Sequence, residues 1–263
     1  MAAKLGLRTV VLAYLGVVLI GPLAFVFSSA FRDGVGPVWD AVSTPDAVSA
    51  LKLTLLTAAI AVPANTVFGV LTALVLTRRR FPGRSLLGAL VDLPLALSPV
   101  VVGLALVLVW GQNGWFGGWA IRHGISVIFS VPGIVLATIV VSLPFVTREL
   151  VPVLRELGVE QQEAAATLGA NGFQTVWRIT LPAVRHGLAY GVVLTTARVI
   201  GEYGAVAVVS GDIAGQSQTM TLYVQDRFQA FDLVGAYSAA VVLALISVAT
   251  VAVLRLVNRR GNP

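Results

Sequence analysis

The sequence has no cysteine, only two histidines and few charged residues, which make up 11% of its 263 positions. Without cysteine, disulfides, thiolate metal sites and a cysteine nucleophile are excluded. The histidines, His123 and His186, lie too far apart for a typical metal-ligand spacing. Soluble domains carry about a quarter charged residues. With 57% hydrophobic residues and a mean hydropathy of +0.90, the composition excludes a disordered chain or a soluble enzyme and predicts a polytopic, all-α membrane protein.

The chain also lacks the Gly-x-x-x-x-Gly-Lys-Ser/Thr loop that cradles nucleotide phosphates, and its only lysines are Lys4 and Lys52. A Walker-type ATP site is therefore excluded, and any ATP hydrolysis that drives this protein belongs to another polypeptide. A membrane enzyme is a weaker alternative, because it needs clustered ionisable side chains at one membrane depth. We expect no catalytic residue and no metal site in this chain.

Long stretches without charged residues predict membrane-spanning helices, since about 20 apolar residues cross the hydrocarbon core. Six are predicted in a single domain covering 1–263: at 9–28, 51–76, 86–110, 127–146, 186–209 and 234–256. The first resembles a signal peptide because Lys4 and Arg8 precede it. Its apolar run is long for a signal peptide, and Ser28-Ser29-Ala30 is a weak cleavage site, so we expect an uncleaved helix.

Basic residues are divided unequally between the two sides of the predicted membrane domain. Four lie on one side: Arg32, Lys52, Arg122 and Arg227. Thirteen lie on the other: Lys4, Arg8, Arg78, Arg79, Arg80, Arg84, Arg148, Arg155, Arg178, Arg185, Arg255, Arg259 and Arg260. Because cytoplasmic loops carry the excess of Lys and Arg, this split predicts a multi-pass protein of the cytoplasmic membrane with both termini cytoplasmic. It also explains the net charge of +6 without nucleic acid as a partner.

The predicted cytoplasmic loop 147–185 is long and amphipathic. Residues 160–168 have high helix propensity, Gly169 supplies a stop, and 172–179 predict a second short helix. The alternative to a docking helix is one lying on the bilayer, whose polar face would be basic. Segment 155–168 instead sets one arginine against three glutamates. A short helix carrying two alanines allows close approach of a partner backbone and fits a groove on a cytosolic protein.

The spacing within this loop resembles the EAA loop of ABC-importer permeases. The residues that carry the resemblance are Glu163, Ala164, Ala165, Gly169, Ile179, Leu181 and Pro182. The resemblance implies the type I (MetI-like) permease fold. It also implies that this loop docks onto an ATPase subunit and transmits its motion.

Further motifs, Ser98-Pro99-Val100, Gly201-Glu202-Tyr203-Gly204-Ala205 and Val209-Ser210-Gly211-Asp212, are similar to those of W-type permease subunits of bacterial sulfate/thiosulfate ABC importers. Tyr203 stands where phenylalanine is usual. The resemblance implies a heterodimer with a T-type permease, two ATPase subunits that bind ATP and Mg, and an extracytoplasmic sulfate-binding protein. A molybdate or tungstate permease is the nearest alternative. An ion-coupled secondary transporter would leave the EAA loop unexplained and needs internal repeats.

Ionisable residues at membrane depth are costly and are usually functional or paired. Arg198 and Glu202 are four residues apart on the fifth predicted helix, so they share a face. Either they form a structural ion pair, or Arg198 lies on the anion path and Glu202 limits how tightly the anion binds. Ser98 and Pro99 are further candidates for the translocation path or for pore structure. Asp92 is expected to cap a helix or to pair with Arg84.

The polar segment 210–231 is predicted on the extracytoplasmic side. Five residues in it are candidates for contact with a binding protein or for the outer mouth of the pore: Ser210, Gly211, Asp212, Gly215 and Thr219. The alternative is a plain polar loop.

Overall fold

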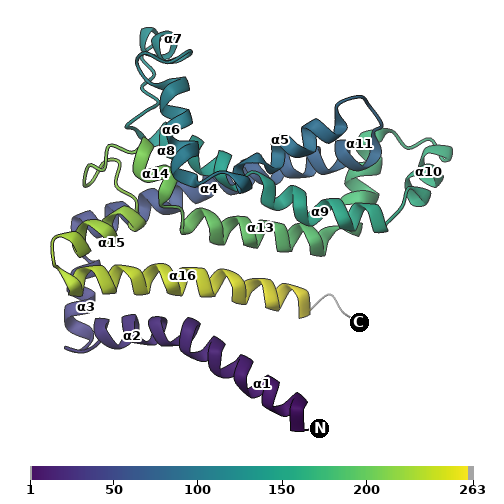
Figure 1. Ribbon diagram of the computed structural model, residues 1–263. Helices are drawn as coiled ribbons and strands as arrows, with labels where there is room; N and C mark the ends of the chain where they lie inside the picture. Colours follow the sequence, from purple (N-terminus) through teal and green to yellow (C-terminus); the bar gives the residue numbers. More distant parts are fainter. Residues whose placement is uncertain (1, 260–263) are drawn as a thin grey trace.

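The computed structural model describes residues 2–259, with the side chains of 8–18 and 20–252. Within these residues every regular element is a helix (Figure 1). Four helical segments are long and apolar enough to cross a membrane: Arg8–Ala30, Pro45–Arg78, Val131–Glu156 and Leu233–Ala252. A bent pair, Arg84–Ala96 with Pro99–Trp110, can add a fifth. The all-helical prediction is confirmed, while the predicted span 186–209 is divided between two shorter helices.

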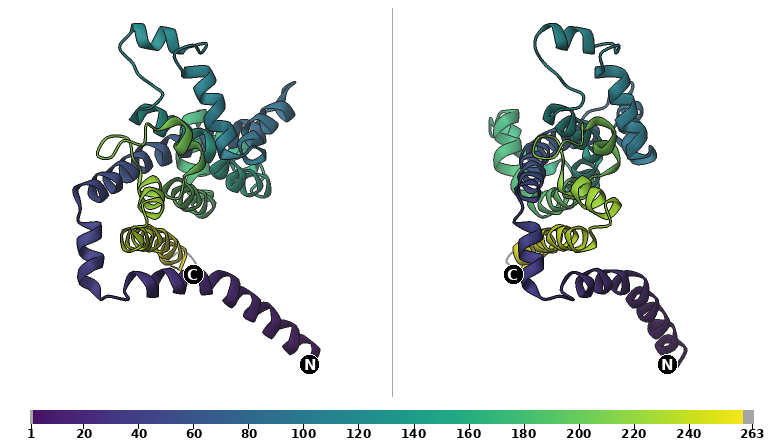
Figure 2. Two further views of the ribbon diagram at one scale, coloured as in Figure 1. Left: turned by 60° about the vertical axis from the view of Figure 1, so that its left-hand side comes forward. Right: turned by 90° about the vertical axis from the view of Figure 1, so that its left-hand side faces the viewer.

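The N-terminal part of the first predicted span stands apart from the other helices. It comprises α1 (Ala2–Leu15), a π-helical turn η1 (Gly16–Ile20) and α2 (Gly21–Ala30). Its most apolar window has no buried residue, and Figures 1 and 2 show α1 leading away from the bundle. Only its C-terminal part is packed, where Phe25 meets Tyr237 of α16 edge-to-face at 6.4 Å between ring centroids. Helix α3 (Val35–Val42) then leads the chain toward the bundle.

The centre of the bundle is α4 (Pro45–Arg78), which packs against α8 (Val131–Ser142), α9 (Pro144–Glu156) and α13 (Arg185–Ile200). Its buried face is made mostly of small residues, as expected where membrane helices approach closely. At Gly69 a β-carbon would lie 2.5 Å from Cβ of Val146 on α9. Only glycine therefore permits this crossing without displacing α9.

The third predicted helix, 86–110, is wrong as a continuous element. The chain forms α5 (Arg84–Ala96) and α6 (Pro99–Trp110), bent by 112°. Pro99 lacks an N–H and disfavours helical backbone in the residue before it, and Ser98 is extended with φ −62° and ψ 138°. Helix α6 continues to α7 (Gly117–Arg122), and together they project from the bundle (Figure 2).

Two further boundaries differ from prediction. The helix expected to end at 146 continues through α8 and α9 to Glu156, because Pro144 occupies the first turn of α9, where a missing N–H costs little. The helix expected over 186–209 breaks at 201–203 and resumes as α14 (Gly204–Val209). Helix α15 (Met220–Gln229) and α16 (Leu233–Arg259) follow, and α16 packs against α15 and α13.

The bundle has two distinguishable ends. Figure 1 shows α10 (Glu160–Thr167), the start of α1 and the end of α16 toward one end, which we call the α10 end. Helices α3 and α15 lie at the opposite α15 end. Four of the thirteen basic residues counted for the predicted cytoplasmic side, Lys4, Arg255, Arg259 and Arg260, lie outside the described side chains.

The crossing at Gly69 yields a testable prediction. Gly69→Ala should lower stability by roughly 1–3 kcal/mol, because the added carbon overpacks the contact with Val146. Gly118→Ala in α7, where a β-carbon meets nothing within 4 Å, is the matched control. The measurement is the midpoint temperature for loss of the monodisperse protein in detergent. Equal midpoints for the two variants would contradict the close packing.

Candidate functional site

Helix α10 ends in a glycine-dependent cap. Gly169 has φ +85°, the left-handed region that favours glycine. The Ala170 N–H donates to the carbonyl of Ala165 at 3.0 Å, and the Gly169 N–H donates to that of Ala166 at 3.0 Å. This pair of bonds is the Schellman arrangement, which satisfies the last carbonyls of a helix and reverses the chain. The predicted stop at Gly169 is confirmed.

The second predicted short helix forms as α11 (Gly172–Thr175), a π-helical turn η2 (Val176–Thr180) and α12 (Leu181–Ala183). Asn171 and Gln174 make a reciprocal capping box, with bonds of 2.8 and 3.0 Å, that fixes its start. Gln162 of α10 donates from Nε2 to Oγ1 of Thr180 at 3.0 Å. The two short helices are thereby held together.

This pair of short helices carries apolar side chains that no residue described by the structure covers. Leu168 is 88% exposed, Phe173 76% and Trp177 64%. The rings of Phe173 and Trp177 stack, with centroids 6.3 Å apart. Rigid aromatic side chains are frequent anchors at protein interfaces. Trp177 was not among the predicted contact residues, although its i, i+4 spacing from Phe173 places both on one helical face.

The predicted coupling residues divide into exposed and supporting groups. Glu163, Ala164, Gly169 and Pro182 are exposed, Ala165 is buried, and Ile179 and Leu181 are partly buried. We call the exposed surface formed by Glu163, Ala164, Leu168, Phe173 and Trp177 the α10 surface. It combines one carboxylate, a small alanine and three large apolar side chains.

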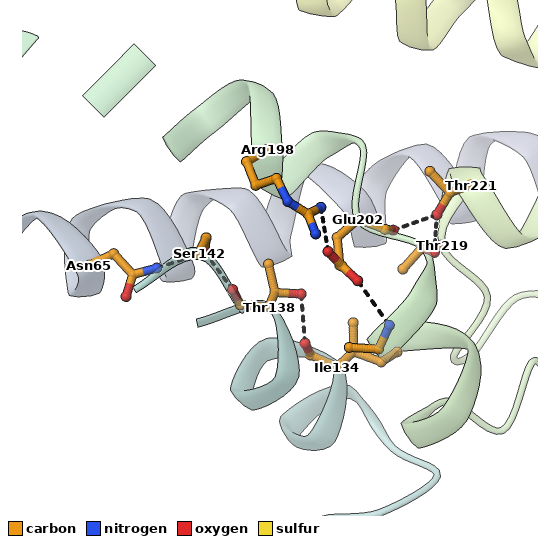
Figure 3. A network of polar contacts seen from close by, with 9 residues as sticks. Asn65, Ile134, Thr138, Ser142, Arg198, Glu202, Thr219 and Thr221 are labelled. Carbon is orange, nitrogen blue, oxygen red and sulfur yellow. Dashed lines mark hydrogen bonds and ion pairs between the residues drawn. The ribbon is translucent and has the colours of Figure 1, made fainter. Parts of the chain in front are cut away.

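At the break between α13 and α14, the predicted pair forms. Arg198 Nη1 lies 2.5 Å from Glu202 Oε2, with side chains 30% and 2% exposed (Figure 3). The other oxygen, Oε1, accepts a hydrogen bond of 2.9 Å from the Ala205 N–H in the first turn of α14. The carboxylate thus both neutralises an arginine and caps the helix that resumes after the break.

Hydroxyl groups continue this polar network between helices. Thr221 of α15 donates to the Glu202 carbonyl at 2.8 Å, and Thr54 of α4 accepts from the Met220 N–H at 2.8 Å. Farther along α4, the fully buried Asn65 donates to Oγ of Ser142 at 2.8 Å (Figure 3). These bonds supply the partners that lipid cannot.

The bend between α5 and α6 lies against the break between α13 and α14. A β-carbon on Gly204 would lie 3.1 Å from Cβ of Pro99, and one on Gly103 would lie 2.9 Å from the Ala205 carbonyl oxygen. The start of α6 therefore packs directly on α14. Of the predicted pathway residues, Pro99 is thus close to the Glu202 break, while Ser98 is exposed beside it.

The polar loop at the α15 end is closed by its own hydrogen bonds. Ser210 Oγ donates to the Ser217 carbonyl at 2.5 Å, and Gln218 donates to Oδ1 of Asp212 at 3.2 Å. Asp212 and Gly215 are exposed at the tip, whereas Ser210 and Thr219 are buried and Gly211 is partly buried. Two of the five predicted contact residues are therefore available to a partner.

Asp92 pairs differently from expectation. Its Oδ1 lies 2.9 Å from Nε of Arg148 on α9, so the expected ion pair with Arg84 is wrong. The two side chains are 42% and 57% exposed. The true partner comes from a helix 56 residues away in sequence, which local spacing cannot indicate.

Comparison with known proteins identifies the family to which this chain belongs. Residues 65–262 match the family described as binding-protein-dependent transport system inner membrane components. The chain is 51% identical over 249 residues to the "Sulfate transport system permease protein CysW" of Synechocystis, covering 95% of this chain and 90% of that protein. The Escherichia coli K12 protein of that name is 48% identical over 89% of this chain and 80% of its own length. The chain belongs to this transport family, as a CysW-type permease.

Solved structures agree with the permease fold. A bacterial ABC transporter that imports the acidic polysaccharide alginate superposes with a TM-score of 0.81, covering 98% of this permease and 95% of that chain. A second structure, of an alginate transporter with a pentasaccharide-bound periplasmic protein, gives 0.80. At 18% and 19% sequence identity these show the fold alone.

The polar network at Glu202 yields a second prediction. Glu202→Ala should lower the stability of the permease by roughly 3 kcal/mol, because Arg198 loses its partner and α14 loses its cap. Glu202→Gln should cost less, since the amide oxygen still accepts from Ala205. The midpoint temperature in detergent measures both. A Gln variant as unstable as the Ala variant would contradict the capping role.

Proposed function

We propose that this permease is the W-type membrane subunit of an ATP-driven importer that carries sulfate, and thiosulfate with it, into the cytoplasm. The 51% identity to a CysW protein over 95% of the chain is the observation that carries the substrate assignment. Relatives named CysT, such as the Escherichia coli K12 protein at 41% identity, support a second permease subunit of the T type as the partner in a heterodimer.

In this assembly six segments cross the membrane and both termini are cytoplasmic. The fifth span in chain order is α13 followed by α14, whose break at 201–203 the Glu202 network supports. The thirteen-to-four division of basic residues supports a cytoplasmic position for the α10 end. The start of α1 and the end of α16 lie toward the same end (Figure 1).

The α10 surface docks onto the ATPase subunits, which bind ATP and Mg. Its exposed Leu168, Phe173 and Trp177 supply apolar anchors for a groove, and the small Ala164 allows close approach. The coupling segment runs from the end of α9 to the start of α13, within the predicted 147–185. At the α15 end, Asp212 and Gly215 face the extracytoplasmic sulfate-binding protein.

Transport of sulfate is the first test. Cells lacking this gene should lose uptake of labelled sulfate, regain it with the gene, and show competition by unlabelled thiosulfate. Unchanged sulfate uptake together with impaired molybdate uptake would move the substrate to molybdate or tungstate. Vanadate should stop transport. If uptake instead continues with vanadate and stops when the proton gradient is collapsed, the protein is a secondary transporter.

The role of Gly169 gives a second test. Gly169→Asp should produce a folded permease with at least a tenfold loss of transport, since a side chain at φ +85° costs roughly 1–2 kcal/mol and unwinds the α10 cap. Gly169→Asn should retain more activity, because asparagine occurs at this cap position and adds no negative charge beside the C-terminal carbonyls of α10. Gly172→Ala, at a position with open space, is the control. Full transport in the Asp variant would contradict the coupling role.

A further inference from the structure

A groove at the α10 end is lined by more positive than negative charge. It lies between α5 and α9, with Leu76 of α4 also lining it, and has a volume of about 430 Å³. Four ionisable side chains line it: Arg84, Asp92, Arg148 and Arg155. Three guanidinium groups against one carboxylate leave a net charge of +2.

The arginines are not equivalent within this groove. Asp92 binds Arg148 at 2.9 Å. Within the described residues, no ion pair joins Arg84 or Arg155 to a carboxylate. Arg148 and Arg155 are two helical turns apart on α9, so the lining charges extend over about 10 Å. Two arginines therefore remain available to an anion at the end of the groove near α10.

The exposure of the Asp92–Arg148 pair indicates that this groove does not face lipid. Both side chains are more than two-fifths exposed, and charges beside membrane helices normally lie at the aqueous interface, in a water-filled path or at a subunit interface. Arg84 begins α5 and Arg155 lies in the last turn of α9, so these two arginines mark the end of the groove nearer α10. The position of this groove suits the point at which a transported anion leaves the permease on the cytoplasmic side.

We propose that this groove binds a tetrahedral dianion, the transported sulfate, at the cytoplasmic end of the translocation path. This inference rests on the proposed function. A charge of +2 balances that of sulfate, and guanidinium groups donate paired hydrogen bonds to oxyanions. The volume leaves room for hydration water, so the anion binds loosely enough to leave. A lipid headgroup phosphate shares this chemistry but carries a single charge in the commonest anionic phospholipids.

The test is binding of labelled sulfate to the assembled importer without its binding protein, in phosphatidylcholine nanodiscs. Arg84→Gln with Arg155→Gln should weaken binding at least about tenfold, as loss of charge-assisted hydrogen bonds does. Arg80→Gln, an exposed arginine that does not line the groove, should change it less than about twofold. No sulfate binding in the unmodified complex, or equal weakening in the control, would overturn the proposal.

Two further measurements distinguish a lipid from free sulfate in the groove, and the groove assignment from the proposed transport function. If phosphatidylglycerol nanodiscs abolish binding that phosphatidylcholine nanodiscs preserve, a lipid headgroup occupies the groove and the free-anion assignment is wrong. Sulfate uptake by the unmodified importer tests the proposed function independently. Uptake in the unmodified importer with normal sulfate binding in the double variant would overturn only the groove assignment.

Discussion

The carboxylate of Glu202 fills the gap where α13 stops and α14 begins, and the inner architecture depends on it. Lipid offers no hydrogen bonds to backbone groups, so a helix broken inside a membrane needs internal partners. Glu202 supplies one to Ala205 and a counter-charge to Arg198, while its carbonyl binds Thr221. With α14 fixed in this way, α6 can cross against it through Gly103 and Gly204.

The packing of small residues also connects the two ends of the molecule. Helix α9 leads directly into α10, and Val146 near its start lies against both Gly69 of α4 and Gly191 of α13. Close-packed interiors transmit displacement rather than absorb it. We propose that a shift of α10 is delivered through these contacts to the helices that carry the Glu202 network. The α10 surface and the polar break are mechanically joined by one helix.

Local sequence patterns predicted the features that depend on neighbouring residues. The α10 stop at Gly169 and the Arg198–Glu202 pair follow from spacing within one or two turns. The spans predicted at 86–110 and 186–209 were drawn as continuous helices, because average hydropathy treats a broken apolar stretch like a straight one. The structure bends the first by 112° before Pro99 and breaks the second at 201–203. The partner of Asp92 was missed because Arg148 comes from a distant helix. The exposure of Trp177 likewise could be recognised only once the fold showed that no neighbouring helix among the described residues packs over it.

We propose that α10 faces the cytoplasm and contacts the ATPase, and cross-linking tests both directly. Because the chain has no cysteine, Ala164→Cys introduces a unique thiol on the exposed face of α10. In the assembled importer, a short thiol cross-linker should join this position to the ATPase subunit, whereas Asp212→Cys at the α15 end should give no such product. Labelling of Cys at 164 by a membrane-impermeant reagent from outside the cell, with no cross-link to the ATPase, would contradict the account.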